Sequence, residues 1–116
     1  MLSLSDAVRY YLYPSPVDMR SGIDSLSGIV RNQMGRNPLE GDVFIFLGKR
    51  RTQLRLLHFE GDGYSLYIKR LEKGTFELPA PGATGTSVTV KAEELYLILK
   101  GVKLASVQRQ KRFSFP

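Results

Sequence analysis

The sequence predicts an α+β fold: a small curled antiparallel β-sheet or partial barrel, with about two helices packed on it. Three observations lead to this prediction. Residues 42–79 alternate β-rich apolar runs with turn residues, as strands joined by tight turns do. Apolar residues recur near the helical period between Ile23 and Met34. Residues 92–100 carry a second helical pattern, with glutamates in the first turn and a lysine in the last.

The chain has room for one hydrophobic core, because it is 116 residues long. We therefore expect a single α+β domain over residues 1–104, followed by a basic C-terminal tail over residues 105–116.

No cysteine is present, which excludes disulfides, thiolate metal sites and a cysteine nucleophile. No apolar run approaches the roughly 20 residues of a membrane helix, and the start lacks a signal-peptide pattern. We expect a cytoplasmic protein that does not associate with membranes.

The first strand is expected over residues 8–13, which are rich in β-formers and are followed by Pro14. Alternation places Tyr11 and Tyr13 beside Arg9 on one face of this strand. Aromatic rings next to a cation suit the stacking of nucleic-acid bases. Tyrosines in such a strand also commonly pack into the core with their hydroxyls at its rim, and both interpretations stay open at this point.

The first helix is expected to begin after an N-cap at Asp18 or Ser21 and to end near Gly35. Its buried stripe consists of Ile23, Leu26, Ile29, Val30 and Met34. Asp18 lies where the helix dipole favours a carboxylate, so a capping role explains it better than a catalytic one.

The strand over residues 43–47 is apolar on both faces, which indicates that both faces are covered. A basic turn over residues 48–51 then leads into a strand over residues 52–59. Lys49, Arg50 and Arg51 repel one another in this turn unless an anion or water separates them, so nucleic-acid phosphate is a natural counterpart. A solvated hairpin tip explains the same cations equally well.

The next hairpin is expected to close through a two-residue turn at Asp62 and Gly63, because Asp-Gly between β-rich runs favours a type I′ turn. This register produces two faces. On the core face it pairs Leu57 with Ile68 and Phe59 with Leu66. On the opposite face it pairs His58 with Tyr67 and Leu56 with Lys69.

The remaining elements are a short strand over residues 75–78, a Pro- and Gly-rich loop over residues 79–87 and a last strand over residues 87–91. We expect Val88 and Val90 to point inward. The second helix, over residues 92–100, is expected to end at Gly101 and to bury Leu95, Ile98 and Leu99.

The net charge of +6 is concentrated near the C-terminus. Five of the 17 basic residues and none of the 11 acidic ones lie in residues 100–116, which leaves 12 basic residues in positions 1–99. Clustered lysines and arginines suit phosphate binding, because each neutralised phosphate releases condensed counterions. A solvated tail that keeps the protein soluble is the alternative.

No pattern in the sequence predicts a reaction. His58 lies near Glu60 and could act as a base, but no motif places a nucleophile beside it. Three carboxylates could hold Mg²⁺ for phosphoryl transfer, yet spacing selects no set of three among the available Asp24, Asp42, Glu60 and Asp62. We expect no enzymatic activity, no cofactor and no metal.

Three segments resemble those of a known family: PVDMRSGIDSLSGIVRNQMG, NPLEGDVFIFLGKRRTQLRLLHFEGDGYSLYIKRLEKGTFELP and the ending QRQKRFSFP. They resemble the small accessory proteins, called TnpB, of bacterial transposable elements of the insertion-sequence sixty-six type. The resemblance extends over nearly the whole chain. That family is distinct from the RNA-guided nucleases that share the name TnpB.

The resemblance implies a protein encoded beside a separate, larger transposase and needed for efficient transposition. It implies no active site, because the family has no agreed catalytic residues. We therefore expect a non-enzymatic accessory factor that binds DNA, at the element ends or the target, or the transposase, or both. The alternative is a protein-interaction module that docks on the transposase without touching DNA. The oligomeric state stays open.

Two groups of candidate site residues follow. The charge pattern selects nucleic-acid contacts at Lys49, Arg50, Arg51, Lys69, Arg70, Arg109, Lys111 and Arg112. The resemblance selects partner-contacting or structural positions at Asp18, Arg20, His58, Tyr67 and Lys73.

Overall fold

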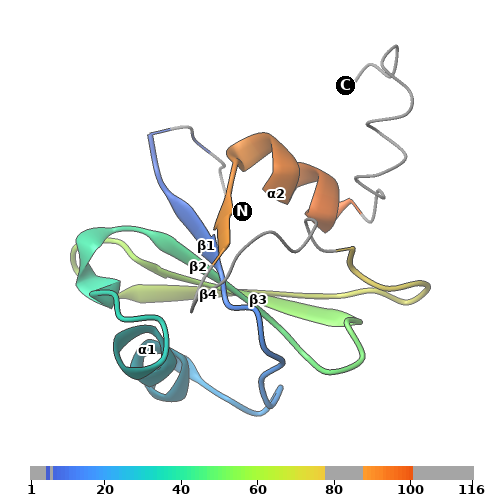
Figure 1. Ribbon diagram of the computed structural model, residues 1–116, viewed down its shortest axis with the longest axis horizontal. Helices are drawn as coiled ribbons and strands as arrows, with labels where there is room; N and C mark the ends of the chain where they lie inside the picture. The colour runs from blue at the N-terminus through green and yellow to red at the C-terminus, as the bar shows by residue number, and fades with distance from the viewer. Residues whose placement is uncertain (1–4, 6, 78–87, 101–116) are drawn as a thin grey trace.

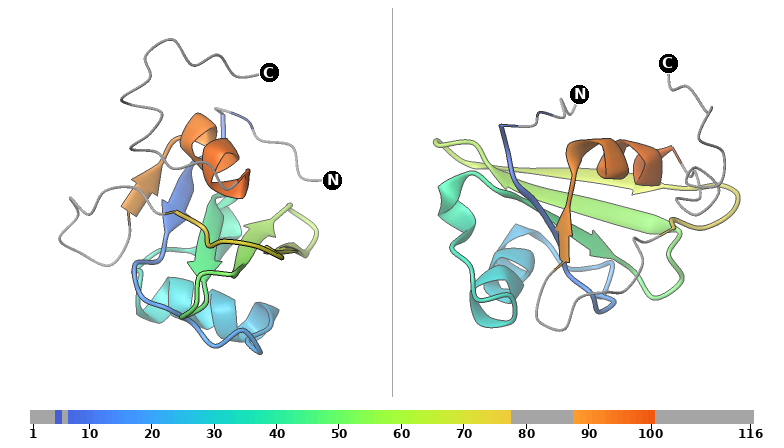
Figure 2. Two further views of the ribbon diagram at one scale, coloured as in Figure 1. Left: turned by 90° about the vertical axis from the view of Figure 1, so that its right-hand side faces the viewer. Right: turned by 45° about the horizontal axis from the view of Figure 1, so that its top comes forward.

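A computed structural model describes residues 5, 7–77 and 88–100 of the chain. It contains a five-stranded sheet in the order β4-β3-β2-β1-β5, with one helix on each face (Figures 1 and 2). The predicted α+β class is confirmed. The elements are β1 (Tyr10–Leu12), α1 (Ile23–Asn32), the 3₁₀-helix η1 (Pro38–Glu40), β2 (Val43–Leu47), β3 (Gln53–Phe59), β4 (Tyr64–Arg70), β5 (Val88–Val90) and α2 (Ala92–Leu99).

The sheet is open and mixed. Strands β2, β3 and β4 form an antiparallel meander, and β5 pairs antiparallel with β1. Strand β1, however, lies parallel to β2, so the expected fully antiparallel arrangement is wrong for this pair. The physical reason is the connection, because α1 lies between the two strands and returns the chain to the end of the sheet where β1 began.

The two faces of the sheet carry separate cores. The face under α1 gathers Tyr11, Leu26, Val30, Met34, Phe44, Phe46 and Leu57. The face under α2 gathers Tyr10, Leu12, Val43, Ile45, Leu47, Leu54, Leu56, Phe76, Val90, Leu95 and Ile98. Every residue of β2 is buried, which confirms that both of its faces are covered. Figure 2 shows the sheet between the two helices.

Helix α1 packs through the predicted stripe. Leu26, Val30 and Met34 are buried, and Ile23 and Ile29 pack beside them. The predicted cap is wrong, because the N-cap residue is Gly22 and no side chain bonds the helix start. Asp18 instead accepts a hydrogen bond from the backbone N–H of Arg20 at 2.8 Å, which stabilises the turn before the helix.

The hairpin between β3 and β4 has a different register from the predicted one. Phe59 pairs with Tyr64 and Leu57 with Leu66, so the strands are displaced by two residues and the connection spans residues 60–63. A two-residue displacement keeps each side chain on its predicted face. The observed register sets the Phe59 and Tyr64 rings edge to face, with centroids 5.1 Å apart. It leaves Ile68 49% exposed, beyond the cover of α1.

Other predictions for the chain end have mixed outcomes. Strand β5 and helix α2 are confirmed, with Leu95 and Ile98 fully buried. Residues 75–77 form no strand, although Phe76 is buried and its N–H bonds the carbonyl of Arg51 at 2.7 Å. Residues 78–87, Gly101 and the boundary between domain and tail lie outside the described residues. Neither of the α-helices described combines the length and the apolar character that a membrane span requires.

Candidate nucleic-acid interface

The turn between β2 and β3, which we call the basic turn, comprises residues 48–51. The N–H of Arg51 bonds the Gly48 carbonyl at 3.0 Å, and the N–H of Gly48 bonds the Gln53 carbonyl at 3.3 Å. Arg51 has a φ of 56°, a left-handed conformation that costs a residue with a Cβ about 1–2 kcal/mol. Lys49, Arg50 and Arg51 are all exposed.

The loop before α1 packs against this turn. The N–H of Val17 bonds the Leu47 carbonyl at 2.9 Å, which extends the pairing beyond β1. The Met19 side chain lies so close that a Cβ on Gly48 would fall 2.8 Å from its Cγ, so a larger residue at position 48 would displace the methionine. A cavity of about 310 Å³ lies between residues 17–19 and residues 48–53. Two segments far apart in the sequence therefore form one site.

Arg20 and Asp18 form an exposed fork in that loop. The Arg20 Nη2 lies 2.7 Å from Asp18 Oδ2, and its Nε lies 3.1 Å from Oδ1. The hydrogen bonds that Arg20 donates lower the pKa of the Asp18 carboxyl to about 2. Asp18 is therefore ionised at neutral pH, and it lines the same cavity as the basic turn.

Arg55 of β3 anchors the loop to the sheet. Its Nη1 donates to the Ser21 carbonyl at 2.6 Å, and its Nη2 donates to the Met19 carbonyl and to Gln53 Oε1. Sequence patterns alone did not select this residue. One signal in the sequence could have identified it. Arg55 lies inside a predicted strand between apolar residues, where a cation without a partner is unfavourable.

Further cations gather at the same end of the sheet. Arg70 ends β4 opposite Gln53, and the N–H of Leu71 bonds the Thr52 carbonyl at 2.7 Å. Lys73 lies in the segment that these bonds hold beside the turn. We call this region the basic end: Arg20, Lys49, Arg50, Arg51, Arg55, Arg70 and Lys73. The acidic residues of the same segments are Asp18, Glu72 and Glu77, of which Asp18 pairs with Arg20 and Glu72 with Arg70, so the region keeps a net positive charge.

Other candidates lie elsewhere. Lys69 donates from Nζ to the Leu99 carbonyl at 2.7 Å and so binds the C-terminus of α2, which gives this lysine a structural contact. Tyr67 packs against the core under α2. His58 pairs with Ser65 near the opposite end of β3, with its Nδ1 4.0 Å from Glu60 Oε1. Arg109, Lys111 and Arg112 lie outside the described residues.

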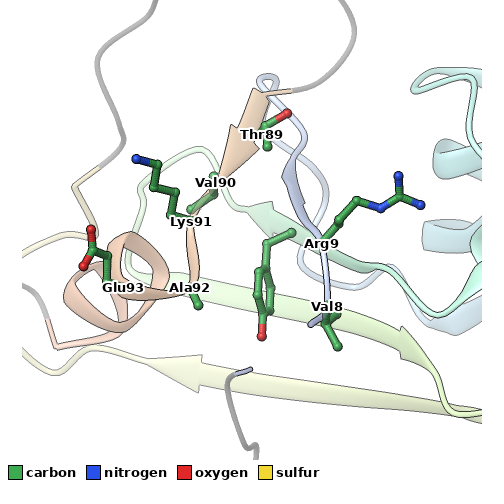
Figure 3. Close-up of a pocket in the computed structure, with 8 residues that line it drawn as sticks. Val8, Arg9, Thr89, Val90, Lys91, Ala92 and Glu93 are labelled. Atoms are coloured by element: carbon green, nitrogen blue, oxygen red, sulfur yellow. The ribbon is translucent and has the colours of Figure 1, made fainter. Parts of the chain in front are cut away.

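A different hollow, of about 440 Å³, lies where β1, β5 and the start of α2 meet (Figure 3). Tyr10, Val90 and Ala92 contribute to its lining, and Arg9 points away from Lys91 and Glu93. Arg9 instead pairs with Asp42, Nε to Oδ1, at 3.3 Å. Within residues 5, 7–77 and 88–100, no three side chains of the metal-binding types lie close enough to share an ion.

Comparison with known proteins places the chain in a family. The model of the family described as "IS66 Orf2 like protein" matches residues 8–109. The chain belongs to the IS66 Orf2-like family. The resemblance inferred from the sequence is thereby confirmed, and membership indicates a transposition-associated accessory role.

Two relatives come from Sinorhizobium fredii. The chain is 32% identical to uncharacterized protein y4hO over 102 residues, which cover 88% of this chain and 87% of the relative. It is 33% identical to uncharacterized protein y4jC over 110 residues, which cover 95% and 92% respectively. No solved structure matches the chain. The assignment of a site therefore depends on the geometry of this IS66 Orf2-like protein itself.

Proposed function

We propose that this protein is a non-enzymatic accessory factor in the transposition of a bacterial insertion sequence. It binds DNA, at the element ends or the target, through the basic end, and it acts in the cytoplasm beside the separate transposase. The observation that carries the proposal is the conformation of Arg51. This residue occupies a left-handed position in a turn where glycine would be relaxed.

The strain at Arg51 supports a ligand for its side chain. A non-glycine residue in an unfavourable backbone conformation is retained when its side chain has a use, and such residues cluster at functional sites. Arg51 lines the 310 Å³ cavity together with Lys49 and Arg50, and the charge of Asp18, which also contributes to the lining, is paired with Arg20. A phosphate bound by Arg51 would explain why a cation occupies this strained position.

The balance of charge supports the same ligand. Among the described residues, the ion pairs involve Arg9, Arg20, His58 and Arg70, so the three cations of the basic turn have no acidic partner. Adjacent cations without counter-charges repel one another, and a DNA phosphate lowers that energy while it releases counterions. Arg20, Arg70 and Lys73 extend the positive surface beyond the turn.

The test is the binding of fluorescent duplex DNA from the element ends, measured by anisotropy over a series of salt concentrations. Neutralising the turn with Lys49→Gln, Arg50→Gln and Arg51→Gln together should weaken binding by at least about tenfold at low salt. It should also reduce the salt slope by about 0.9 for each phosphate that the variant no longer neutralises. The matched control is Arg31→Gln, an exposed cation in the last turn of α1. Equal affinity in the triple variant and the wild type would refute the proposal.

A second candidate function is docking on the transposase without direct DNA contact. The observation that favours it is strand β4, which lies at the edge of the sheet and exposes Ile68. An unpaired edge with an exposed apolar side chain can accept an added strand from a partner. Copurification with the transposase after nuclease treatment, and its loss in Ile68→Lys, would favour this function over DNA binding.

A further inference from the structure

A second hollow adjoins the basic turn. Its volume is about 130 Å³, and the residues that line it include Tyr13, Pro14, Pro16, Lys49 and Arg51. Lys49 and Arg51 therefore line both hollows. The first hollow is bordered by the Asp18 loop, whereas this one is bordered by a tyrosine and two prolines.

The hollow is preformed by the way in which the chain leaves β1. The N–H of Tyr13 bonds the Ile45 carbonyl at 3.0 Å, and the N–H of Val17 bonds the Leu47 carbonyl at 2.9 Å. Between these two bonds, Pro14 and Pro16 have no N–H to donate and have restricted φ angles. The segment thus bulges away from β2 in a stiff conformation.

The sequence predicts Tyr11 and Tyr13 on the same face of the first strand. Of these two tyrosines, Tyr13 is the more exposed. Tyr11 is only 4% exposed, stacks on Phe44 and is covered by the Arg36 guanidinium at 3.7 Å, so of the two interpretations left open by the sequence, packing into the core holds for Tyr11. Tyr13 is half-buried, and its ring rests on Phe46 with centroids 6.0 Å apart. This contact holds the ring in position, and Tyr13 also contributes to the lining of the hollow.

The size and lining of the hollow define its ligand. Sites for complete small molecules usually exceed about 300 Å³, so this hollow accepts one group of a larger ligand. A flat group suits the tyrosine and proline rings, and anions on either side of it suit Lys49 and Arg51. A nucleobase with its flanking phosphates has this chemistry.

We propose that the basic turn binds single-stranded DNA, with one unpaired base on Tyr13 and the flanking phosphates on Lys49 and Arg51. The inference rests on the proposed DNA-binding function and specifies the form of the DNA. Bases of a duplex are stacked and paired, so only a single strand or a separated end presents a base to this hollow. An aromatic or proline side chain of a protein partner would fit the rings but would leave Lys49 and Arg51 without anions.

The experiment compares a short single-stranded oligonucleotide with its duplex, by anisotropy at one salt concentration. Wild-type protein should prefer the single strand. Tyr13→Leu should weaken single-strand binding by about tenfold or more and leave duplex binding unchanged, whereas Tyr13→Phe should keep the preference. The control is Tyr96→Leu, which removes an α2 tyrosine that also lies beside a cation, Lys100, at 5.5 Å. This control should not alter either affinity.

A direct readout is photocrosslinking of an oligonucleotide that contains 5-iodouracil, with the crosslinked residue identified by mass spectrometry. A crosslink at Tyr13 supports the inference, and crosslinks confined to other residues overturn it. Equal losses of single-strand and duplex binding in Tyr13→Leu also overturn the inference. So does a result in which the transposase, but not DNA, shields Tyr13 from chemical modification. Duplex binding that depends on Arg51, without any single-strand preference, refutes only this inference. Failure to bind either form refutes the proposed function as well.

Discussion

Strand β3 is joined to its neighbours by two turns of opposite character. The basic turn, residues 48–51, precedes it, and a turn over residues 60–63, which we call the acidic turn, follows it. Both turns need one residue with positive φ. In the acidic turn this residue is Gly61, with a φ of 95°, whereas in the basic turn it is Arg51, with a φ of 56°.

The difference indicates which turn has a ligand. Glycine adopts a positive φ without strain, and a Cβ on Gly61 would meet nothing within 4 Å, so the acidic turn is a relaxed connection exposed to water. The basic turn instead keeps an unfavourable residue and is packed against Met19 of a second segment. Glycine supplies the positive φ in the acidic turn, where only backbone geometry matters. In the basic turn an arginine supplies it, which indicates that its side chain has a function.

The largest expected effect on stability tests whether the basic turn depends on Arg55, a half-buried anchor. Arg55→Met should lower the free energy of unfolding by about 2 kcal/mol, because it removes charged hydrogen bonds to the loop carbonyls of Met19 and Ser21. Urea denaturation measures the change. The control is Arg70→Met in the neighbouring strand, where the exposed pair with Glu72 should contribute less than about 1 kcal/mol. Equal losses in both variants would show that Arg55 is not an anchor.

The next effect separates strain from function in the two turns. Arg51→Gly should leave stability unchanged or raise it by up to about 1 kcal/mol, because relief of the left-handed strain exceeds the entropy that glycine loses. The same variant should bind DNA more weakly. Gly61→Ala should do the reverse, with a loss of about 1 kcal/mol and unchanged DNA binding. Thermal denaturation and anisotropy measure the two quantities. A destabilised Arg51→Gly would contradict the comparison.

The smallest effect concerns the carboxylate beside the basic turn. Hydrogen bonds from Arg20 lower the pKa of Asp18 from 3.8 to about 2. Because the folded value lies below the unfolded one, the associated stability is complete above pH 3.8 and is lost as the pH falls through about 2.

Carbon-13 NMR of the carboxyl group checks this shift. Arg20→Gln should return the pKa of Asp18 toward 3.8, whereas Arg51→Gln, with the same change of charge, should leave it in place. An Asp18 pKa that stays near 2 in Arg20→Gln would show that another group holds the carboxylate.

Local patterns predicted most elements correctly, because they depend on neighbours a few residues away. The apolar run of β2, the stripe of α1 and the acidic start of α2 each appear where the sequence indicated. The three adjacent cations of the basic turn could also be selected, because they are consecutive. The hairpin register could not, because a four-residue connection and a two-residue turn keep the same faces, and the aromatic pair of Phe59 and Tyr64 favours the former.

The site itself required contacts between distant segments. Arg55 bonds the Ser21 carbonyl 34 positions away, and Lys69 bonds the Leu99 carbonyl 30 positions away. Such pairs leave no periodic pattern in the sequence. The sequence therefore could not separate the structural Lys69 from the exposed cations, or identify Arg55 as an anchor.

The sequence by itself determined the α+β class, the family and the presence of three consecutive cations in one turn. The tertiary structure decided which tyrosine stays accessible and which residues surround those cations. The physical reason is packing: Arg36 covers Tyr11, while Pro14 and Pro16 hold the chain away from β2 and leave Tyr13 beside Lys49 and Arg51. Composition predicts charge, but only the folded chain places a ring next to it.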